Sequence, residues 1–261
     1  MTPAIGAPVP VLRASQVAVR HADASAPVLS GFCLDLAEGE IVSILGPSGV
    51  GKSSLLRVLA GLQAPSAGQI TLDGEALRGV HPRLAMAFQQ PGLLPWLDLE
   101  RNVAFGLDFR RQPELSAAER NRRVAQAIEK VGLTTARKQR PAALSGGMAQ
   151  RAALARCLAR QPKVLLMDEP FGALDEITRA GMQDLLVRLV GDYRTAAVLV
   201  THDIDEALLV SDRVLLLGGS PASVLGEWQI DLPRPRADAV AELGQIRIEI
   251  VAELRSASRL H

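Results

Sequence analysis

The residues best suited to chemistry fall in three segments of this 261-residue chain. A glycine-rich stretch, Gly46 to Ser53, fits the pattern G-x-x-x-x-G-K-[ST]. Later in the chain comes Leu144-Ser145-Gly146-Gly147, and an apolar run then ends at the neighbouring carboxylates Asp168 and Glu169. Together these segments offer a cradle for phosphate, a helix start with bare backbone amides, and a pair of acids.

The glycine-rich stretch predicts a phosphate-binding loop. It follows the apolar run 41–45 and precedes a helical pattern from about 53 to 61, which is the context that the motif requires. Glycines let backbone N–H groups turn toward phosphate oxygens, and the helix start adds its positive dipole. We expect Lys52 to reach the β- and γ-phosphates of a nucleotide and Ser53 to place its hydroxyl on Mg²⁺. The predicted cradle consists of Gly46, Pro47, Ser48, Gly49, Val50, Gly51, Lys52, Ser53 and Ser54.

The acid pair predicts a second part of the same site. The run 163–167 would deliver both acids to the carboxyl end of a strand, where ligands bind in open α/β sheets. Asp168 would hold Mg²⁺, and Glu169 would accept a proton from an attacking water, a step that contributes about 10²–10⁴-fold to a rate. The alternative is that Asp-Glu-Pro merely ends a strand, with Pro170 as the breaker.

Ser145 followed by two glycines predicts a helix N-terminus. The serine hydroxyl can cap the first turn, while Gly146 and Gly147 leave backbone amides bare at the positive end of the dipole. A helix rich in alanine and leucine would continue from about 148 to 160. The segment is therefore a second anion-binding helix end, unless it is an ordinary capped helix.

Short apolar runs that alternate with longer helical patterns predict the elements that position these residues. Several runs are apolar on both faces, as parallel strands covered by helices are. We therefore predict an α/β fold with a mostly parallel central sheet and an antiparallel β region that combines the chain before residue 41 with 68–72. Strands of the central sheet are expected at 41–45, 84–88, 164–167, 197–200 and 214–217.

A mostly helical lobe, from about 95 to 160, is predicted between the second and third of these strands. Within it, Ser116 and Glu119 form a capping box in front of a helical pattern. The expected organisation is one domain over 11–236, with this lobe inserted, and a C-terminal helical extension over 237–261.

Composition limits the class of protein. Hydrophobic residues make up 48% of the chain and aromatic residues only 3%, so the core must consist of leucine, valine, isoleucine and alanine. The net charge is +1, which gives no indication of nucleic acid as a partner. No apolar run approaches the roughly 18 residues of a membrane helix, and the N-terminus lacks the features of a signal peptide. We expect a soluble, intracellular chain that another subunit would hold at any membrane where it works.

In this order, the three segments resemble those of the ATP-hydrolysing subunit of an ABC transporter, and the resemblance covers about 11–236. It implies the P-loop NTPase fold of an ABC cassette, with ATP and Mg²⁺ bound. It also implies a homodimer in which ATP is sandwiched head to tail. The nucleotide on Lys52 of one subunit would then meet Ser145, Gly146 and Gly147 of the other.

Further residues match this family one by one. Gln89 corresponds to a glutamine that contacts the metal and the water, and His202 to a histidine that hydrogen-bonds the γ-phosphate. Asp175 matches the loop that touches the opposite subunit's site. His21 stands where the family usually has an aromatic residue stacked on adenine, and it either stacks there or is only a loop residue. The resemblance gives Glu169, His202 and Gln89 as catalytic residues, and Ser53, Gln89 and Asp168 as metal ligands.

Finer features resemble the nitrate, sulfonate and taurine importers, a subfamily that includes transporters of thiamine precursors. They are Leu94-Pro95-Trp96, 171–175 and 232–236. Trp96 lies where the family docks its membrane permease, although it could instead belong to the core of the lobe.

These features imply a subunit that energises import of a small solute through a separate permease, by ATP-driven dimerisation. A periplasmic or lipid-anchored solute-binding protein would be an indirect partner. The subunit would lie peripherally on the cytoplasmic face of the inner membrane. The alternative is an ATP-dependent switch in a non-transport or export complex.

Overall fold

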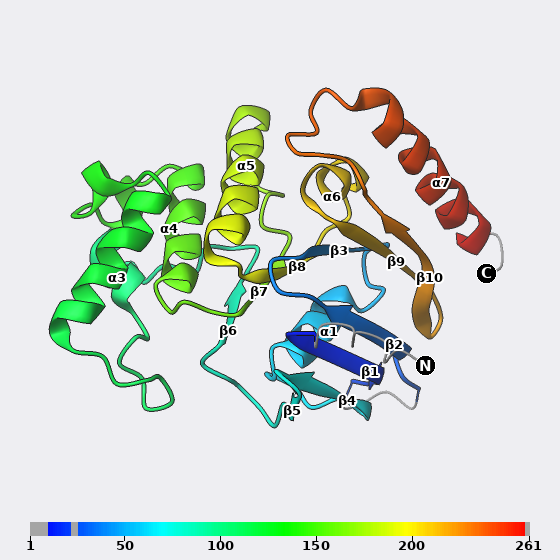
Figure 1. Cartoon of the computed structure of the whole chain (residues 1–261), viewed down its shortest axis with the longest axis horizontal. Coiled ribbons are helices and arrows are strands. Elements are labelled where there is room, and N and C mark those ends of the chain that lie inside the picture. The colour runs from blue at the N-terminus through cyan, green and yellow to red at the C-terminus, as the bar shows by residue number, and fades with distance from the viewer. Residues whose placement is uncertain (1–9, 22–25, 259–261) are drawn as a thin grey trace, which may run out of the picture.

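A computed structural model describes residues 10–21 and 26–258. It contains a ten-stranded mixed sheet in the order β5-β4-β1-β2-β10-β9-β3-β8-β7-β6, with helices packed on both faces (Figure 1). The strands are β1 (Leu12–Val19), β2 (Leu29–Leu36), β3 (Ile41–Leu45), β4 (Ala67–Leu72), β5 (Glu75–Ala76), β6 (Leu84–Ala87), β7 (Val164–Asp168), β8 (Ala196–Val200), β9 (Arg213–Gly219) and β10 (Ala222–Gln229). The helices are α1 (Lys52–Leu59), α2 (Leu99–Ala104), α3 (Ala117–Lys130), α4 (Gly146–Leu158), α5 (Glu176–Tyr193), α6 (Ile204–Val210) and α7 (Val240–Ser258), with short 3₁₀ turns at Thr134–Ala136 and Pro141–Ala143.

The five strands β9, β3, β8, β7 and β6 are parallel neighbours, which confirms the predicted central sheet. Alternate residues of β7 enter different cores. Val164 and Leu166 pack in the cluster that contains α1, whereas Leu165 and Met167 pack in the cluster that contains α4 and α5. Because both faces of the strand are covered, its sequence is a continuous apolar run.

The antiparallel region is also confirmed. The strand β1 pairs with β2 on one side and with β4 on the other, both antiparallel. This region joins the rest of the sheet through β2 and β10, which are parallel and pair at Ala222 and Leu29 within the described residues. The backbone pairing between the two parts of the sheet therefore lies at the first residue of β2.

Helices α2, α3 and α4 lie between β6 and β7 in the chain and contact one another. Figure 1 shows α3 and α4 at one side of the molecule. Ser116 caps α3, as expected, by accepting a hydrogen bond of 3.2 Å from the backbone N–H of Glu119. The predicted capping box also requires a second hydrogen bond, from the N–H of Ser116 to the Glu119 carboxylate, and this part of the prediction is wrong. The Glu119 carboxylate instead accepts from Arg123 Nε at 2.7 Å, because an arginine one turn later offers it a charged partner.

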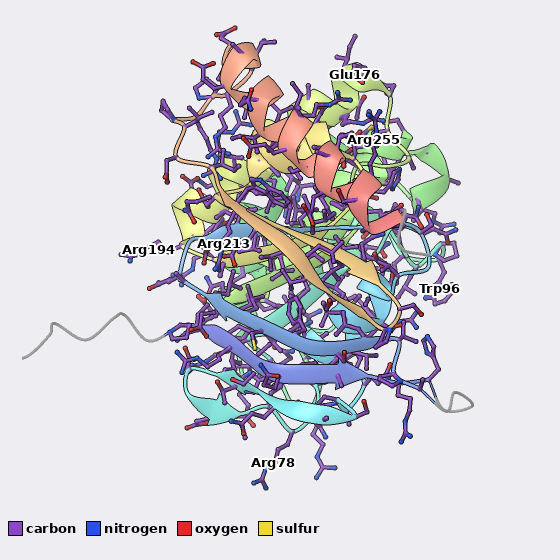
Figure 2. The ribbon with its side chains drawn as sticks, turned by 90° about the vertical axis from the view of Figure 1, so that its right-hand side faces the viewer. Arg78, Trp96, Glu176, Arg194, Arg213 and Arg255 are labelled. Atoms are coloured by element: carbon purple, nitrogen blue, oxygen red, sulfur yellow. The ribbon has the colours of Figure 1, made fainter. Side chains whose placement is uncertain are left out.

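The predicted terminal helix is present as α7 and crosses over β9 and β10 (Figure 2). Ile250 is fully buried in its inner face, and Leu243, Ile246 and Leu254 pack beside it against a cluster that includes Leu216. Within the described ranges, no helix is both long and apolar enough to cross a membrane.

The segment before α7 is anchored by a buried cation, Arg236, whose residue surface is 3% exposed. Its guanidinium donates to the carbonyl oxygens of Leu208 at 3.0 Å, Ile230 at 2.8 Å and Leu232 at 3.0 Å, and also to that of Ser211. Burial lowers the pKa of Arg236, although the planar fork keeps all of its donors directed at backbone acceptors. The arginine thus joins the end of α6 to the segment between β10 and α7.

We predict that Arg236→Lys lowers the free energy of unfolding by about 2–4 kcal/mol, because one ammonium cannot reach all four carbonyl groups and leaves buried acceptors unpaired. Urea denaturation measures this loss. The matched control is Arg255→Lys on the exposed face of α7, which we expect to change stability by about 0.5 kcal/mol or less. Equal losses in the two variants would contradict the assignment.

Candidate functional site

The glycine-rich loop joins β3 to α1, and close packing requires glycine at two of its positions. A Cβ at Gly46 would lie 2.8 Å from the carbonyl oxygen of Leu217, and one at Gly51 would lie 2.9 Å from Val28 Cγ1. Gly51 also has a φ of 102°, in the left-handed region that favours glycine. The helix that follows begins at Lys52, one residue earlier than predicted, so the loop leads directly into a helix N-terminus.

Lys52 is buried, and its side chain bonds back to the first residues of the loop. Its Nζ donates to the carbonyl oxygens of Gly46 at 2.7 Å and Pro47 at 2.9 Å. Burial lowers the pKa of the ammonium, and the nearby carboxylates of Glu169 and Asp168 oppose that shift. An ammonium bonded to neutral carbonyl oxygens, beside a helix N-terminus, is well placed to attract an anion.

Ser53 and Asp168 lie next to each other, as expected of two ligands for one metal. Ser53 Oγ donates to Asp168 Oδ1 at 3.1 Å, although the two residues are far apart in the chain. A hydroxyl from the start of α1 and a carboxylate from the end of β7 provide the hard oxygen donors that Mg²⁺ prefers. The donor set therefore fits this metal.

Glu169 brings the three predicted catalytic residues together. Gln89 Nε2 donates to its Oε2 at 3.1 Å, and His202 Nδ1 lies 3.1 Å from its Oε1. The backbone of Glu169 has a φ of 44°, a left-handed conformation that costs a non-glycine residue about 1–2 kcal/mol. Its N–H is tied to the carbonyl oxygen of Val200 at 2.9 Å, so the carboxylate is held at a fixed place at the end of β7.

Two further predicted segments begin helices. Ser145 Oγ accepts from the N–H of Met148 at 3.3 Å and caps α4, as predicted, and Asp175 Oδ1 accepts from the N–H of Thr178 at 3.0 Å and caps α5. That hydrogen bond holds the pKa of Asp175 below its usual value. The helix starts are in contact, because a Cβ at Gly147 would lie 2.4 Å from Thr178 Cγ2.

Not every predicted residue joins this cluster. Across residues 10–21 and 26–258, no hydrogen bond or ion pair connects Ser145, Gly146, Gly147 or Asp175 to the phosphate loop or to Glu169. His21 is exposed in the loop after β1, and the described chain offers its ring no polar partner. Its stacking on adenine stays a prediction.

One contact that sequence reasoning missed links the serine segment to the acid pair. Gln150, in the second turn of α4, is buried and donates from Nε2 to the carbonyl oxygen of Pro170 at 3.0 Å. Pro170 directly follows Glu169. The place of this glutamine one turn after the glycines was the available signal, and the start of α4 is thereby fixed to the loop that carries the acid.

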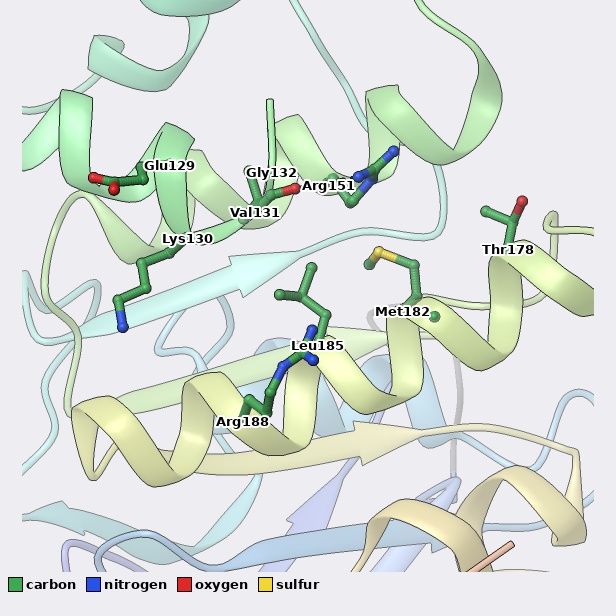
Figure 3. A pocket seen from close by; sticks show the side chains of 10 residues that line it. Glu129, Lys130, Val131, Gly132, Arg151, Thr178, Met182, Leu185 and Arg188 are labelled. Atoms are coloured by element: carbon green, nitrogen blue, oxygen red, sulfur yellow. Dashed lines mark hydrogen bonds between the residues drawn. The ribbon is translucent and has the colours of Figure 1, made fainter. Parts of the chain in front are cut away.

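The site itself is open. Ser53 and Gln89 are exposed, and the His202 side chain is 59% exposed. A pocket of about 390 Å³ lies elsewhere, where Met182 and Leu185 of α5 point toward Val131 and Arg151 (Figure 3), and none of its lining residues belongs to the predicted site. A substrate at the phosphate loop would therefore lie on a surface, with one side facing solvent.

The comparisons with known proteins agree with this geometry. The family model described as "ABC transporter" matches residues 29–172, a range that contains the phosphate loop, the serine segment and the acid pair. The chain is 50% identical to the aliphatic sulfonates import ATP-binding protein SsuB 1 of Xanthomonas axonopodis pv. citri, over 88% of this chain and 91% of that protein. It is 43% identical to the nitrate transport protein NasD of Klebsiella oxytoca, over 87% and 88% of the two chains.

Among solved structures, the chain is similar to the dimeric post-hydrolysis state of the ATP-binding cassette MJ0796 bound to ADP and Pi. The TM-score is 0.73 at 30% identity, over 85% of this chain and all of that one. The match confirms the fold that the sequence predicted. The chain therefore belongs to the ABC transporter family, in which it is an ATPase subunit coupled to transport.

Proposed function

We propose that two copies of this chain bind ATP between them, hydrolyse it at Glu169, and so energise import of a small solute through a separate membrane permease. The observation that carries the proposal is the convergence of Gln89 and His202 on the Glu169 carboxylate, next to the bonded pair of Ser53 and Asp168. This arrangement combines a proton acceptor with a metal site at the end of a phosphate loop.

Each residue has a distinct task in this proposal. The loop amides and Lys52 bind the β- and γ-phosphates, and Ser53 and Asp168 hold Mg²⁺, which neutralises phosphate charge when bound. Glu169 accepts the proton of the attacking water at a carboxylate oxygen. Gln89 and His202 orient that carboxylate, and His202, being exposed, is also free to meet the γ-phosphate.

We predict that Glu169→Gln lowers ATP turnover by about 10²–10⁴-fold while ATP still binds, because the amide keeps the shape of the side chain but cannot accept the proton. Light scattering after size exclusion should show an ATP-bound dimer that accumulates. The matched control is Glu75→Gln on β5, at the opposite edge of the sheet, which should retain wild-type turnover. Undiminished turnover in Glu169→Gln would remove this residue as the base.

The open surface of the site favours a second wall supplied by another subunit. Ser145 and Gly146 form a second anion-binding helix end that does not reach the phosphate loop of its own chain by any hydrogen bond among the described residues. In a head-to-tail dimer, this end covers the γ-phosphate held by Lys52 of the other copy. The structure of MJ0796, which is described as dimeric and bound to ADP and Pi, supports a dimer with nucleotide bound.

We predict that two inactive variants, Lys52→Ala and Ser145→Arg, restore turnover when they are mixed. If the site is shared, a mixed dimer contains one site with both defects and one site with none. Random pairing then gives about a quarter of the wild-type number of intact sites. Steady-state ATPase measurements on the equimolar mixture test this. No recovery would contradict a shared site, since variants that carry complete sites within one chain cannot complement each other.

Trp96 provides a docking point for the permease in this proposal. The residue is 67% exposed, so the alternative that it lies in the core of the helical lobe is wrong. Its loop is nevertheless held by hydrogen bonds to a buried side chain. The fully buried Asn102 accepts from the N–H of Leu94 at 2.7 Å and donates to the carbonyl oxygens of Leu94, Leu97 and Asp98 at 3.1 Å each. An exposed aromatic residue on a loop held in this way is a typical interface anchor.

The sulfonate and nitrate names of the relatives favour a small oxyanion as the solute, with thiamine precursors as the second candidate of the subfamily. The subunit would then work peripherally on the cytoplasmic face of the inner membrane, with a solute-binding protein as its indirect partner. A thermal-shift screen of the solute-binding protein encoded beside this chain tests the solute class. We expect sulfonates, taurine or nitrate to raise the melting temperature of the solute-binding protein. If neither these solutes nor pyrimidine precursors change it, the subfamily assignment is contradicted, whereas the proposed ATPase function is not affected.

A further inference from the structure

A buried carboxylate next to the site has no role in the function proposed so far. Glu206, in the first turn of α6, is only 5% exposed. Its Oε2 accepts from Thr201 Oγ1 at 2.8 Å, and Thr201 is itself buried. Thr201 directly precedes His202, so Glu206 holds the backbone from which the histidine side chain projects.

The other carboxylate oxygen faces a cation. Glu206 Oε1 lies 3.6 Å from Arg179 Nε, and this Nε is buried with no hydrogen-bond partner. The same guanidinium donates from Nη2 to the carbonyl oxygen of Leu174 at 3.1 Å and from Nη1 to Glu176 Oε2 at 3.3 Å. The Arg179 side chain therefore holds Leu174, the residue that leads into Asp175.

The carboxylate of this pair is costly to bury, whereas the Arg179 side chain is 26% exposed. Burial raises the pKa of Glu206, and Asp203 acts in the same direction, whereas the Thr201 hydroxyl, Arg179 and His202 oppose the shift. Replacing a buried ion pair with apolar residues of similar volume is often neutral or stabilising. Stability alone is thus a weak reason for this pair, and its two ends lie at the two loops that flank Glu169.

We propose that Arg179 and Glu206 are positioning residues that couple the Asp175 loop to His202. The path runs from Asp175 through Arg179 and Glu206 to Thr201, and His202 then contacts the Glu169 carboxylate at 3.1 Å. The inference rests on the proposed function, in which the Asp175 loop meets the partner subunit and Glu169 is the base. Contact of a partner with one loop then sets the position of the histidine at the other.

The test separates positioning from stability by comparing Arg179→Met, Glu206→Met and the double variant. Arg179→Met leaves the buried Glu206 carboxylate without its cation, so we expect the melting temperature of this variant to fall most. Glu206→Met should lower the melting temperature less, because Arg179 keeps Glu176 as a partner, and the double variant, which has no buried charge at this place, recovers stability. ATP turnover should stay roughly tenfold or more below wild type in all three, because the link between the loops is absent in each. The dissociation constant of ATP should change less than about twofold, since the phosphate loop is intact.

Turnover that recovers together with the melting temperature in the double variant would overturn the inference, because the pair would then serve stability only. Wild-type turnover in either single variant would do the same. Arg188→Met, an exposed position on the same helix with no polar partner in the described chain, is the control and should leave both quantities unchanged. Glu169→Gln in the same assay tests the proposed function separately. Full turnover in that variant would exclude Glu169 as the base, independently of the results for the other variants.

Discussion

The parallel ladder that joins β3, β8 and β7 is the constraint on which the site depends. Ile44 pairs with Val200, and Val200 pairs in turn with Asp168. Because these strands run in the same direction and in register, their carboxyl ends meet at one edge of the sheet. The phosphate loop, the acid pair and the histidine each leave a strand at that edge. Their side chains therefore meet although the chain separates them widely.

Burial of both faces keeps this ladder in register. A shift of one residue would turn the α1-facing residues of β7 toward α5 and the reverse, and every apolar contact on both sides would change. The polar contacts of the site then span only short distances, such as the 3.1 Å between Ser53 Oγ and Asp168 Oδ1. The apolar core thus determines the geometry, and the polar residues need only complete it.

The sequence predicted most accurately what local pattern determines. The bounds of β3 were predicted correctly because an apolar run directly precedes the glycine motif. The cap at Ser145 was predicted correctly because a serine in front of two glycines is typical of a helix start. Polar residues buried by tertiary contacts were not predicted. Asn102 and Arg236 look like ordinary polar residues in sequence, because only the folded chain brings the carbonyl groups that they bind.

Other features depend on competition or on a second molecule. The return bond of the capping box failed because Arg123 attracts Glu119 more strongly than a backbone amide does. The shared site and the role of His21 involve a partner or a ligand, so neither the chain's pattern nor its own contacts determine them.

The cap at Ser145 has a consequence for the choice of residue at that position. A serine that accepts from the Met148 N–H still has its own proton to donate, because a hydroxyl is donor and acceptor at once. Aspartate caps helices about as well, but it has no proton to offer and adds a negative charge where an anion would approach. For helix stability alone, serine and aspartate would be equally suitable at this position. A serine hydroxyl can cap the start of a helix and donate a hydrogen bond to a phosphate with the same oxygen atom.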